Sequence, residues 1–227
     1  MIPTFVCGSD LEKQHKFFAR WQDSCPDVHI IEDGIVSESA YSTAKLKILF
    51  LLKEVNDWGG EGTLCDFLAA GGMAQTWNNV ARWTKGIISL AINAEEDIPW
   101  KELDVIDNDY RKEQLRKICA VNIKKTSGGS YSVFDELTDF VDSNKERLRQ
   151  QLEICDPDII ICCGTAWHYK RLMETDAKWD ATSRGIPYIR ERKRLVVDYC
   201  HPQARMSSAI LYYSLIDAIR NIGLPKR

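Results

Sequence analysis

Residues 47–62 read KILFLLKEVNDWGGEG, and this stretch changes character at its midpoint. An apolar run ends at Leu52, and a lysine, two acids and an asparagine follow it within five residues. A short apolar run without alternation is typical of a strand that a parallel sheet buries on both faces. The polar half of the stretch would then begin where that strand ends.

Three later segments repeat this change from apolar to polar, namely ICAVNIKKT (118–126), DIIICCGTAWH (158–168) and RLVVDYCHPQAR (194–205). Between the apolar runs stand segments with helical spacing or helix-capping residues, at 9–24, 62–72, 76–92, 109–117, 132–154, 165–173 and 206–223. Strands that alternate with helices predict βαβ units. We therefore expect the fold class α/β, with three α/β/α layers around a mostly parallel central sheet.

Two of these segments carry a more specific prediction. Residues 132–154 contain two capping-box patterns, which begin at Ser132 and Ser143 and favour two helices. Residues 186–199 are typical of a hairpin of two strands. No repeat or linker marks a second domain, so we expect one domain over residues 1–227.

Composition narrows the class of protein. The chain has 227 residues, of which 44% are hydrophobic, and its apolar runs fall short of the roughly 18 residues that a membrane-spanning helix needs. With no secretory signal pattern at the start, we expect a cytoplasmic protein without a membrane partner. The eight cysteines form no C-x-x-C pair, which favours reduced, buried thiols and no metal site or redox cofactor.

The net charge of −3 hides an asymmetry. Residues 1–150 carry 18 Lys and Arg against 24 Asp and Glu, whereas residues 151–227 carry 12 against 9. The basic excess includes RERKR (190–194) and Arg205. Such a run is either a solvated surface or a face that attracts a phosphate backbone, and charge alone does not decide between them.

Ligands of open α/β sheets bind outside the carboxyl ends of the strands. The four polar clusters KEVND, NIKKT, CGTAWH and CHPQAR each follow an apolar run. We expect them to meet at one edge of the sheet, although more than 140 residues separate the first from the last. The polar half of residues 47–62 would then form one wall of a site.

In this order the four segments resemble the motifs of the uracil-DNA glycosylase superfamily. Its members show a strand ending in G-Q-D-P-Y-H or G-E-A-P-G, a T-N-V-V-K strand, a P-x-x-I-V-x-L-G strand and a late H-P-S motif. The likeness spans about residues 45–222. It implies a uracil-DNA glycosylase-like fold, base excision from DNA after base flipping, and a monomer. Some members hold an iron–sulfur cluster on four cysteines, but the cysteine spacing here does not reproduce that pattern, so no cluster is expected.

The first motif lacks the glycine and the proline of the family, which leaves its register open. Without a gap, Glu54 takes the aspartate place of G-Q-D-P-Y-H, Asn56 the tyrosine place and Asp57 the histidine place. Against G-E-A-P-G, Glu54 takes the glutamate place. Glu54 or Asp57 would stabilise a cationic sugar and orient water. The alternative for each is a solvated loop acid.

His201 in CHPQAR would donate a hydrogen bond to the pyrimidine O2 as negative charge develops there. Its alternative is a structural hydrogen bond. Asn122 would read the Watson–Crick edge of the base, or else tie two loops together. Trp58 or Phe67 would stack on the extruded base, or else belong to the core.

Contacts to phosphates are expected from side chains and backbone groups at the strand ends. These residues are Lys124, Lys125, Ser127, Gly164, Thr165, Gln203 and Arg205. Matched to H-P-S-P-L, Arg205 also stands where a leucine wedge enters the base stack, so it would fill the vacated space or contact a phosphate.

The resulting hypothesis is a DNA glycosylase that excises a pyrimidine. In uracil-specific relatives the tyrosine of G-Q-D-P-Y-H excludes substituents at C5, and Asn56 at that place predicts a C5-substituted pyrimidine. A modified cytosine of phage DNA would make the protein an antiviral defence enzyme. The alternatives are uracil excision in DNA repair, a DNA-binding module without chemistry, and an enzyme of free nucleosides or nucleotides.

Overall fold

The computed structural model describes residues 9–225 except 60–61, 96, 130 and 192. Gly60, Glu61 and Arg192, which belong to segments singled out in the sequence, and the cysteine Cys7 lie outside the described residues. The described chain has a seven-stranded sheet in the order β1-β4-β2-β6-β9-β8-β7 and a separate two-stranded pair, β3 and β5.

Four neighbouring strands of the large sheet are parallel. They are β4 (Ile118–Asn122), β2 (Ile48–Leu52), β6 (Ile159–Cys163) and β9 (Leu195–Tyr199). The short strands at the two ends of the sheet run antiparallel to their neighbours, and they are β1 (Gly34–Ile35), β8 (Pro187–Arg190) and β7 (Asp180–Ala181). The expected α/β class, the mostly parallel sheet and the hairpin in 186–199 are confirmed.

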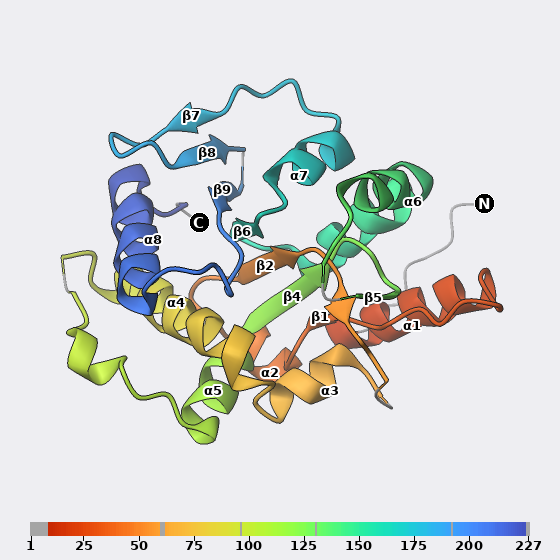
Figure 1. Cartoon of the computed structure of the whole chain (residues 1–227), viewed down its shortest axis with the longest axis horizontal. Helices are drawn as coiled ribbons and strands as arrows, with labels where there is room; N and C mark the ends of the chain where they lie inside the picture. Colours follow the sequence, from red (N-terminus) through yellow and green to blue (C-terminus); the bar gives the residue numbers. More distant parts are fainter. Residues whose placement is uncertain (1–8, 60–61, 96, 130, 192, 226–227) are drawn as a thin grey trace.

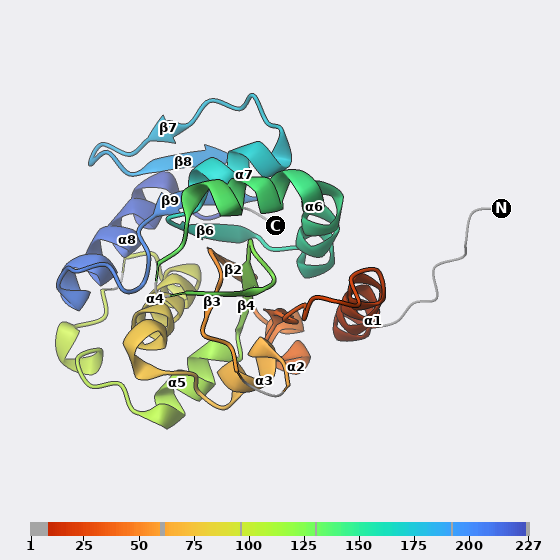
Figure 2. The same cartoon turned by 45° about the vertical axis from the view of Figure 1, so that its right-hand side comes forward.

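Helices cover both faces of the sheet (Figures 1 and 2). One face packs against α3 (Leu64–Ala69), α4 (Ala74–Ile92), α5 (Asn108–Leu115) and α8 (Ser208–Ile222). The other packs against α1 (Asp10–Asp23), α2 (Glu38–Ser42), α6 (Phe134–Cys155) and α7 (Ala166–Met173). A short 3₁₀ helix, η1 (Trp100–Glu102), lies between α4 and α5.

Strand β2 explains why its sequence is apolar throughout. Ile48, Phe50 and Leu52 join the core under α4 and α8. Leu49 and Leu51 join the core under α1, α6 and α7. Because successive side chains of a strand point to opposite faces, every side chain of β2 enters one of the two cores.

Local capping agrees with the sequence at several helix ends. The Ser9 hydroxyl accepts a hydrogen bond from the Glu12 amide at the start of α1. Thr63 and Asp66 form a complete capping box at the start of α3. Such bonds satisfy amides that have no partner within the helix.

The expectation of two helices in 132–154 is confirmed, because two helical segments meet there at a kink. Residues Phe134–Cys155 form one element, α6, with a kink at Asn144, whose backbone is not helical. The kink lies next to the second capping pattern. The capping box predicted to begin at Ser132 does not form, because Val133 is the residue that precedes the helix and no side chain caps its first turn.

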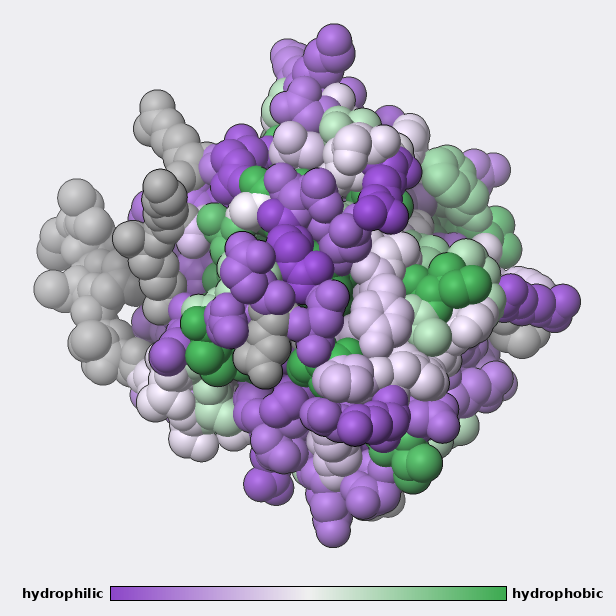
Figure 3. Space-filling view, turned by 90° about the vertical axis from the view of Figure 1, so that its left-hand side faces the viewer, coloured by the Kyte–Doolittle hydropathy of each residue, from purple (hydrophilic) through white to green (hydrophobic). Residues whose placement is uncertain are grey.

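No helix of the described residues is long and apolar enough to cross a membrane. Seven described cysteines carry free thiols, and five of these are buried. On the face of the molecule that carries α8, hydrophobic residues stand in small separate groups among hydrophilic ones (Figure 3).

Candidate functional site

The four polar clusters lie at one edge of the sheet, as expected, because β4, β2, β6 and β9 are adjacent and parallel. Backbone hydrogen bonds extend the sheet into these clusters. The Ile123 and Lys124 amides donate to the Leu52 and Lys53 carbonyls, and the Gly164 amide donates to the Tyr199 carbonyl. Segments far apart in sequence are therefore held in register where their polar residues begin.

Lys53, the first residue after β2, extends towards β6 and β9. A side chain added at Gly164 would meet the Cε atom of Lys53 at 3.5 Å, so the lysine stem lies over this glycine. The positive charge of Lys53 acts on two imidazoles, because it lowers the pKa of both His201 and His168. Lys53 thus follows β2 and lies over Gly164, which follows β6, and its charge acts on the histidine that follows β9.

His201 is held in one tautomer by its own loop. The Gln203 amide donates to its Nδ1 atom at 3.2 Å, which leaves the proton on Nε2. Burial, and secondly the Lys53 charge, lower the pKa of His201 from its ordinary value of 6.5. At neutral pH the ring is therefore an uncharged hydrogen-bond donor through Nε2.

Helix α4 fixes the loop that carries His201. The Asn79 side chain donates to the Pro202 carbonyl at 2.7 Å, and the Gln203 side chain donates to the hydroxyl of Thr76. Arg82 in turn donates to the Asn79 side-chain oxygen at 3.0 Å. The position of the imidazole therefore depends on a helix that begins more than 120 residues earlier in the chain.

Glu54 points away from Lys53, towards β4 and β5 (Ser127–Gly128). Its side chain is only 4% exposed and lies 3.0 Å from the Lys124 amine, which also pairs with Glu136 at 2.8 Å. Burial favours the neutral amine, but hydrogen bonds to Glu136 and Glu54 outweigh it and raise the pKa of Lys124. Glu54 is therefore an enclosed carboxylate and not a solvated loop acid.

Asp57 occupies a different environment three residues later. It follows β3 (Val55–Asn56), which pairs with β5, and its amide donates to the Gly128 carbonyl at 3.0 Å. Its backbone has a φ of 44°, in the left-handed region that short polar residues tolerate best. The side chain is exposed, so Asp57 is the accessible carboxylate of the first motif.

Of the residues expected to bind the base, Trp58 and Phe67 are partly buried and Asn56 is exposed. Trp58 and Phe67 meet edge to face with ring centres 5.9 Å apart, and both are partly buried against the core. The Trp58 amide donates to the exposed Ser127 hydroxyl at 2.8 Å. Asn56 is exposed and pairs with Gly128 through the backbone. The arrangement favours core packing for the two aromatic rings.

The prediction that Lys125 contacts a phosphate is wrong. Its side chain is fully buried and its amine lies 2.7 Å from Asp33 and 2.6 Å from the Asn122 carbonyl. Gln151 also donates to this Asp33 carboxylate at 2.7 Å. Burial lowers the pKa of Lys125, and Asp33 opposes this effect. The amine is an internal partner of a buried carboxylate and does not reach the surface.

Asn122 belongs to the same buried network. Its backbone amide and its side-chain amide donate to one Asp33 oxygen, at 2.7 and 3.3 Å. The residue is 3% exposed. This is the alternative in which the amide ties two segments together, here β4 and the residues before β1, and it does not leave the amide free to read a base.

Thr165 is also wrong as a phosphate contact, because it is fully buried and its hydroxyl donates to the Leu51 carbonyl at 2.8 Å. Gly164, Gln203 and Arg205 are exposed at the edge. Within the described part of the chain, Arg205 has no ion pair. The described residues of the run at 190–194, namely Arg190, Glu191, Lys193 and Arg194, lie at the opposite end of β9 from Arg205, since they run from the last residue of β8 to the start of β9. The two basic groups therefore do not form one face.

Two residues of the site carried little or no weight in the sequence. Lys53 stands in the glutamine place of G-Q-D-P-Y-H or in the glycine place of G-E-A-P-G, and only its position directly after the strand marked it. His168 on α7 is 2% exposed, and its ring packs against Phe134 with centres 4.7 Å apart. Neither of its nitrogens makes a hydrogen bond of ordinary geometry. Burial lowers the pKa of His168, the Phe134 backbone opposes this, and Lys53 and Arg171 add to it.

Neither a model of a known protein family nor a curated protein matches this chain. The groups at the edge of the sheet are therefore the basis for assigning a function. It combines a lysine, a neutral imidazole donor, one enclosed and one accessible carboxylate, and backbone groups at four strand ends. Such a set can stabilise an anion on one side and a cation on the other.

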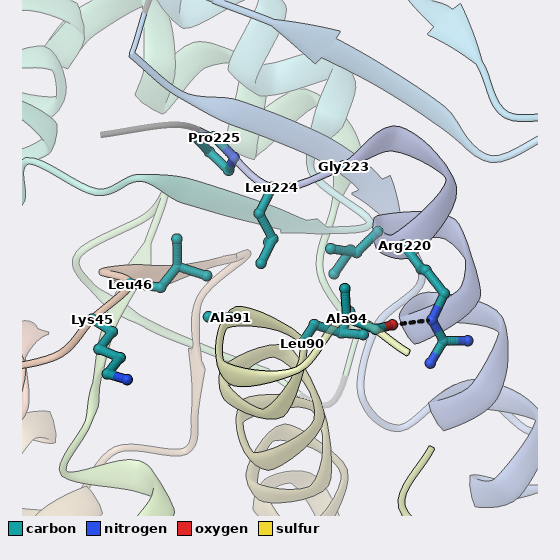
Figure 4. A pocket seen from close by; sticks show the side chains of 10 residues that line it. Lys45, Leu46, Leu90, Ala91, Ala94, Arg220, Gly223, Leu224 and Pro225 are labelled. Atoms are coloured by element: carbon teal, nitrogen blue, oxygen red, sulfur yellow. Dashed lines mark hydrogen bonds between the residues drawn. The ribbon is translucent and has the colours of Figure 1, made fainter. Parts of the chain in front are cut away.

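Two hollows of the surface lie away from His201. One, of about 340 Å³, is lined by Lys45, Leu46, Leu90, Leu224 and neighbours at the amino end of β2, opposite the edge with His201 (Figure 4). A second hollow borders Trp167 and Lys170 on α7. Among the described residues, no group of three His, Cys, Asp or Glu side chains is placed to hold a metal ion. The edge of the sheet carries the chemistry, and the hollow at its other end is mainly apolar.

Proposed function

We propose that this protein is a DNA glycosylase that extrudes a pyrimidine nucleotide and hydrolyses its glycosidic bond. The observation that carries the proposal is the convergence of the four motif-like segments on one edge of four adjacent parallel strands. Each segment alone is a weak signal. Their convergence agrees with the resemblance to the uracil-DNA glycosylase superfamily, because it brings the four motif-like segments together as one site.

The reaction cleaves the bond between C1′ and the base nitrogen, and both electrons leave with the base. Water then adds its hydroxyl to C1′, and its proton ends on the base. His201 suits the leaving side, because a neutral imidazole with its proton on Nε2 can donate to a developing oxyanion. A carboxylate suits the sugar side, where positive charge develops.

Asp57 and Glu54 compete for the role of that carboxylate. Asp57 is exposed and lacks an ion pair within the described residues, so it can reach a bound sugar and water. Glu54 is enclosed and paired with Lys124, so it would act only after the pair has opened. We therefore assign the role to Asp57, with Glu54 as the alternative.

We further propose a pyrimidine with a C5 substituent, such as a modified cytosine of phage DNA, as the preferred base. The support is that Asn56, which stands in the tyrosine place of the family motif, is an exposed and short polar residue. Uracil excision in repair is the alternative. On either substrate, extrusion costs a few kcal/mol before chemistry begins.

A DNA-binding module without chemistry is the second candidate, and the ion pair of Glu54 with Lys124 is the observation that favours it. One experiment separates the two candidates. Single- and double-stranded oligonucleotides carrying uracil, thymine, 5-hydroxymethylcytosine or its glucosylated form are incubated with the protein, and abasic sites are detected by alkali cleavage and the free base by mass.

Release of a C5-substituted base faster than uracil supports the full proposal. Release of uracil alone keeps the glycosylase and replaces the substrate. Salt-sensitive DNA binding without any abasic site leaves the binding module.

A further inference from the structure

Lys53 is an uncompensated positive charge at the proposed site. Lys53 and Glu54 are consecutive, yet Glu54 pairs with Lys124 while Lys53 lies over Gly164. Among the described residues Lys53 forms no ion pair. A half-buried lysine without a carboxylate is an attractive partner for a negatively charged ligand, because partial burial weakens the screening by water.

The two imidazoles on which the Lys53 charge acts add no negative charge. On the side of β9 stands His201, whose Nδ1 atom is occupied by the Gln203 amide and whose Nε2 atom carries the proton. On the side of α7 stands His168, buried against Phe134. Both rings are neutral near pH 7, since burial and Lys53 itself lower their pKa values. An anion that enters here meets one ammonium group and one N–H donor.

We propose that Lys53 and His201 form a single anion-binding site that holds the negative charge of the departing pyrimidine. This inference rests on the proposed function and gives its leaving-group side a second residue. Lys53 supplies the charge and His201 a directed hydrogen bond. This place belongs to a glutamine in G-Q-D-P-Y-H and to a glycine in G-E-A-P-G, so in either register the ammonium group is a property of this chain.

The first test varies the leaving base. Single-turnover release is measured for a series of C5-substituted uracils of increasing acidity at the ring nitrogen, with the parent protein, Lys53→Met, Lys53→Arg and the control Lys170→Met, an exposed lysine on α7. Lys53→Met should slow release on the order of 10²-fold for uracil, as loss of one preorganised donor does. The loss should shrink as the base becomes more acidic, so the rate should depend more steeply on leaving-group acidity. Lys53→Arg should keep the parental slope.

A lysine that only supports the loop would slow all bases equally, and parallel slopes for the parent and Lys53→Met would therefore overturn the proposal. Lys170→Met should change neither the rate nor the slope. This reading also separates two failures: if no oligonucleotide releases a base, the proposed function itself is wrong.

The second test needs no activity. 5-Nitrouracil, which is largely anionic near neutral pH, thymine, which is neutral, and inorganic phosphate are titrated into the protein by calorimetry. The parent should bind 5-nitrouracil at least about tenfold more tightly than thymine, in line with a hydrogen bond to a charged group, and Lys53→Met should lose this preference. An unchanged preference in Lys53→Met would contradict the role of Lys53. Binding of phosphate but not of 5-nitrouracil would show a phosphate site instead, and would likewise overturn the proposal.

Discussion

The side chain of Asn79 on α4 donates a hydrogen bond of 2.7 Å to the carbonyl of Pro202, the residue next to His201. Arg82 holds Asn79 at 3.0 Å and donates to the carbonyl groups of Leu103 and Asp104 at 2.7 and 2.9 Å. The loop that carries the imidazole is therefore fixed by a buried chain of bonds that runs through α4 to the segment before α5.

Asn79→Leu should loosen His201 and weaken the fold together. The Pro202 carbonyl and one Arg82 nitrogen would lose their partner, which costs about 1–3 kcal/mol of unfolding free energy. Base release should fall by up to about 10²-fold, the effect of displacing a catalytic group by about 1 Å. Urea denaturation and single-turnover rates measure the two effects.

Gln75→Leu is the control for Asn79→Leu, since it changes an exposed residue of the same helix that forms no hydrogen bond with the described residues of the His201 loop. It should change stability by less than about 0.5 kcal/mol. Equal rates for Asn79→Leu and the parent would show that α4 does not position His201.

Gly128→Ala should displace Glu54 with little effect on stability. A Cβ atom at this position would lie 2.2 Å from the Glu54 Cδ atom, and the end of a flexible side chain can move away. At Gly129 an added Cβ atom would meet nothing within 4 Å, so Gly129→Ala is a matched control. If Glu54 takes part in the reaction, Gly128→Ala slows base release and Gly129→Ala does not. Unchanged rates in both variants would leave Glu54 a structural ion-pair partner.

Asp57→Asn and Glu54→Gln decide which carboxylate acts on the sugar. We expect Asp57→Asn to slow base release by at least about 10²-fold, the lower end of general acid–base effects, with DNA binding retained. Glu54→Gln should slow it less, because Glu54 is enclosed and paired. Rates and DNA affinities are measured on the same oligonucleotide. A larger effect of Glu54→Gln would reverse the assignment.

Lys125→Met should be strongly destabilising, because Lys125 is buried. It would leave the Asp33 carboxylate buried without its cation, which typically costs about 3–5 kcal/mol. Lys16→Met, which breaks an exposed pair with Glu12 on α1, should change stability far less, because water screens this pair. Chemical denaturation compares the two. A loss near that of Lys16→Met would mean that Asp33 has found another partner.

The stability of the protein should fall when the pH falls below about 6.5, the ordinary pKa of histidine. Folding lowers the pKa values of His168 and His201, so the unfolded chain binds more protons in this range and stability rises with pH. Above pH 6.5 the histidines are neutral in both states and do not reduce the free energy of unfolding. Below pH 6.5 the unfolded chain takes up protons first, and this free energy falls progressively. His168→Phe should reduce the slope of unfolding free energy against pH between about 6.5 and 5.5. An identical slope would show that His168 does not titrate there.

Much of the fold follows from local pattern. The apolar runs at 48–52, 118–122, 159–163 and 195–199 became the four parallel strands, because a strand buried on both faces requires an unbroken apolar sequence. Thr63 and Ser9 cap helices as their residue types predict. The two-residue strands β1, β3, β5 and β7 carried no such signal, since pairs this short are set by their neighbours.

The candidate site was predictable in place but not in detail. The rule that polar residues gather at the carboxyl ends of parallel strands brought Glu54, Gly164 and His201 to one edge. It could not tell Lys124, which is partly exposed, from its neighbour Lys125, which is buried. Asp33 decides that difference, and it lies 92 residues from Lys125 in the chain.

The sequence by itself determined which segments are buried and where each one turns polar, because these depend on hydrophobicity and spacing along the chain. Only the tertiary structure decided which polar group meets which. Lys53 lies over Gly164 and beside His201, while Glu54 turns to Lys124, because β2 stands between β6 on one side and β4 on the other. Ion pairs and hydrogen bonds between distant residues depend on distances of a few ångströms, and those distances exist only once the sheet has been assembled.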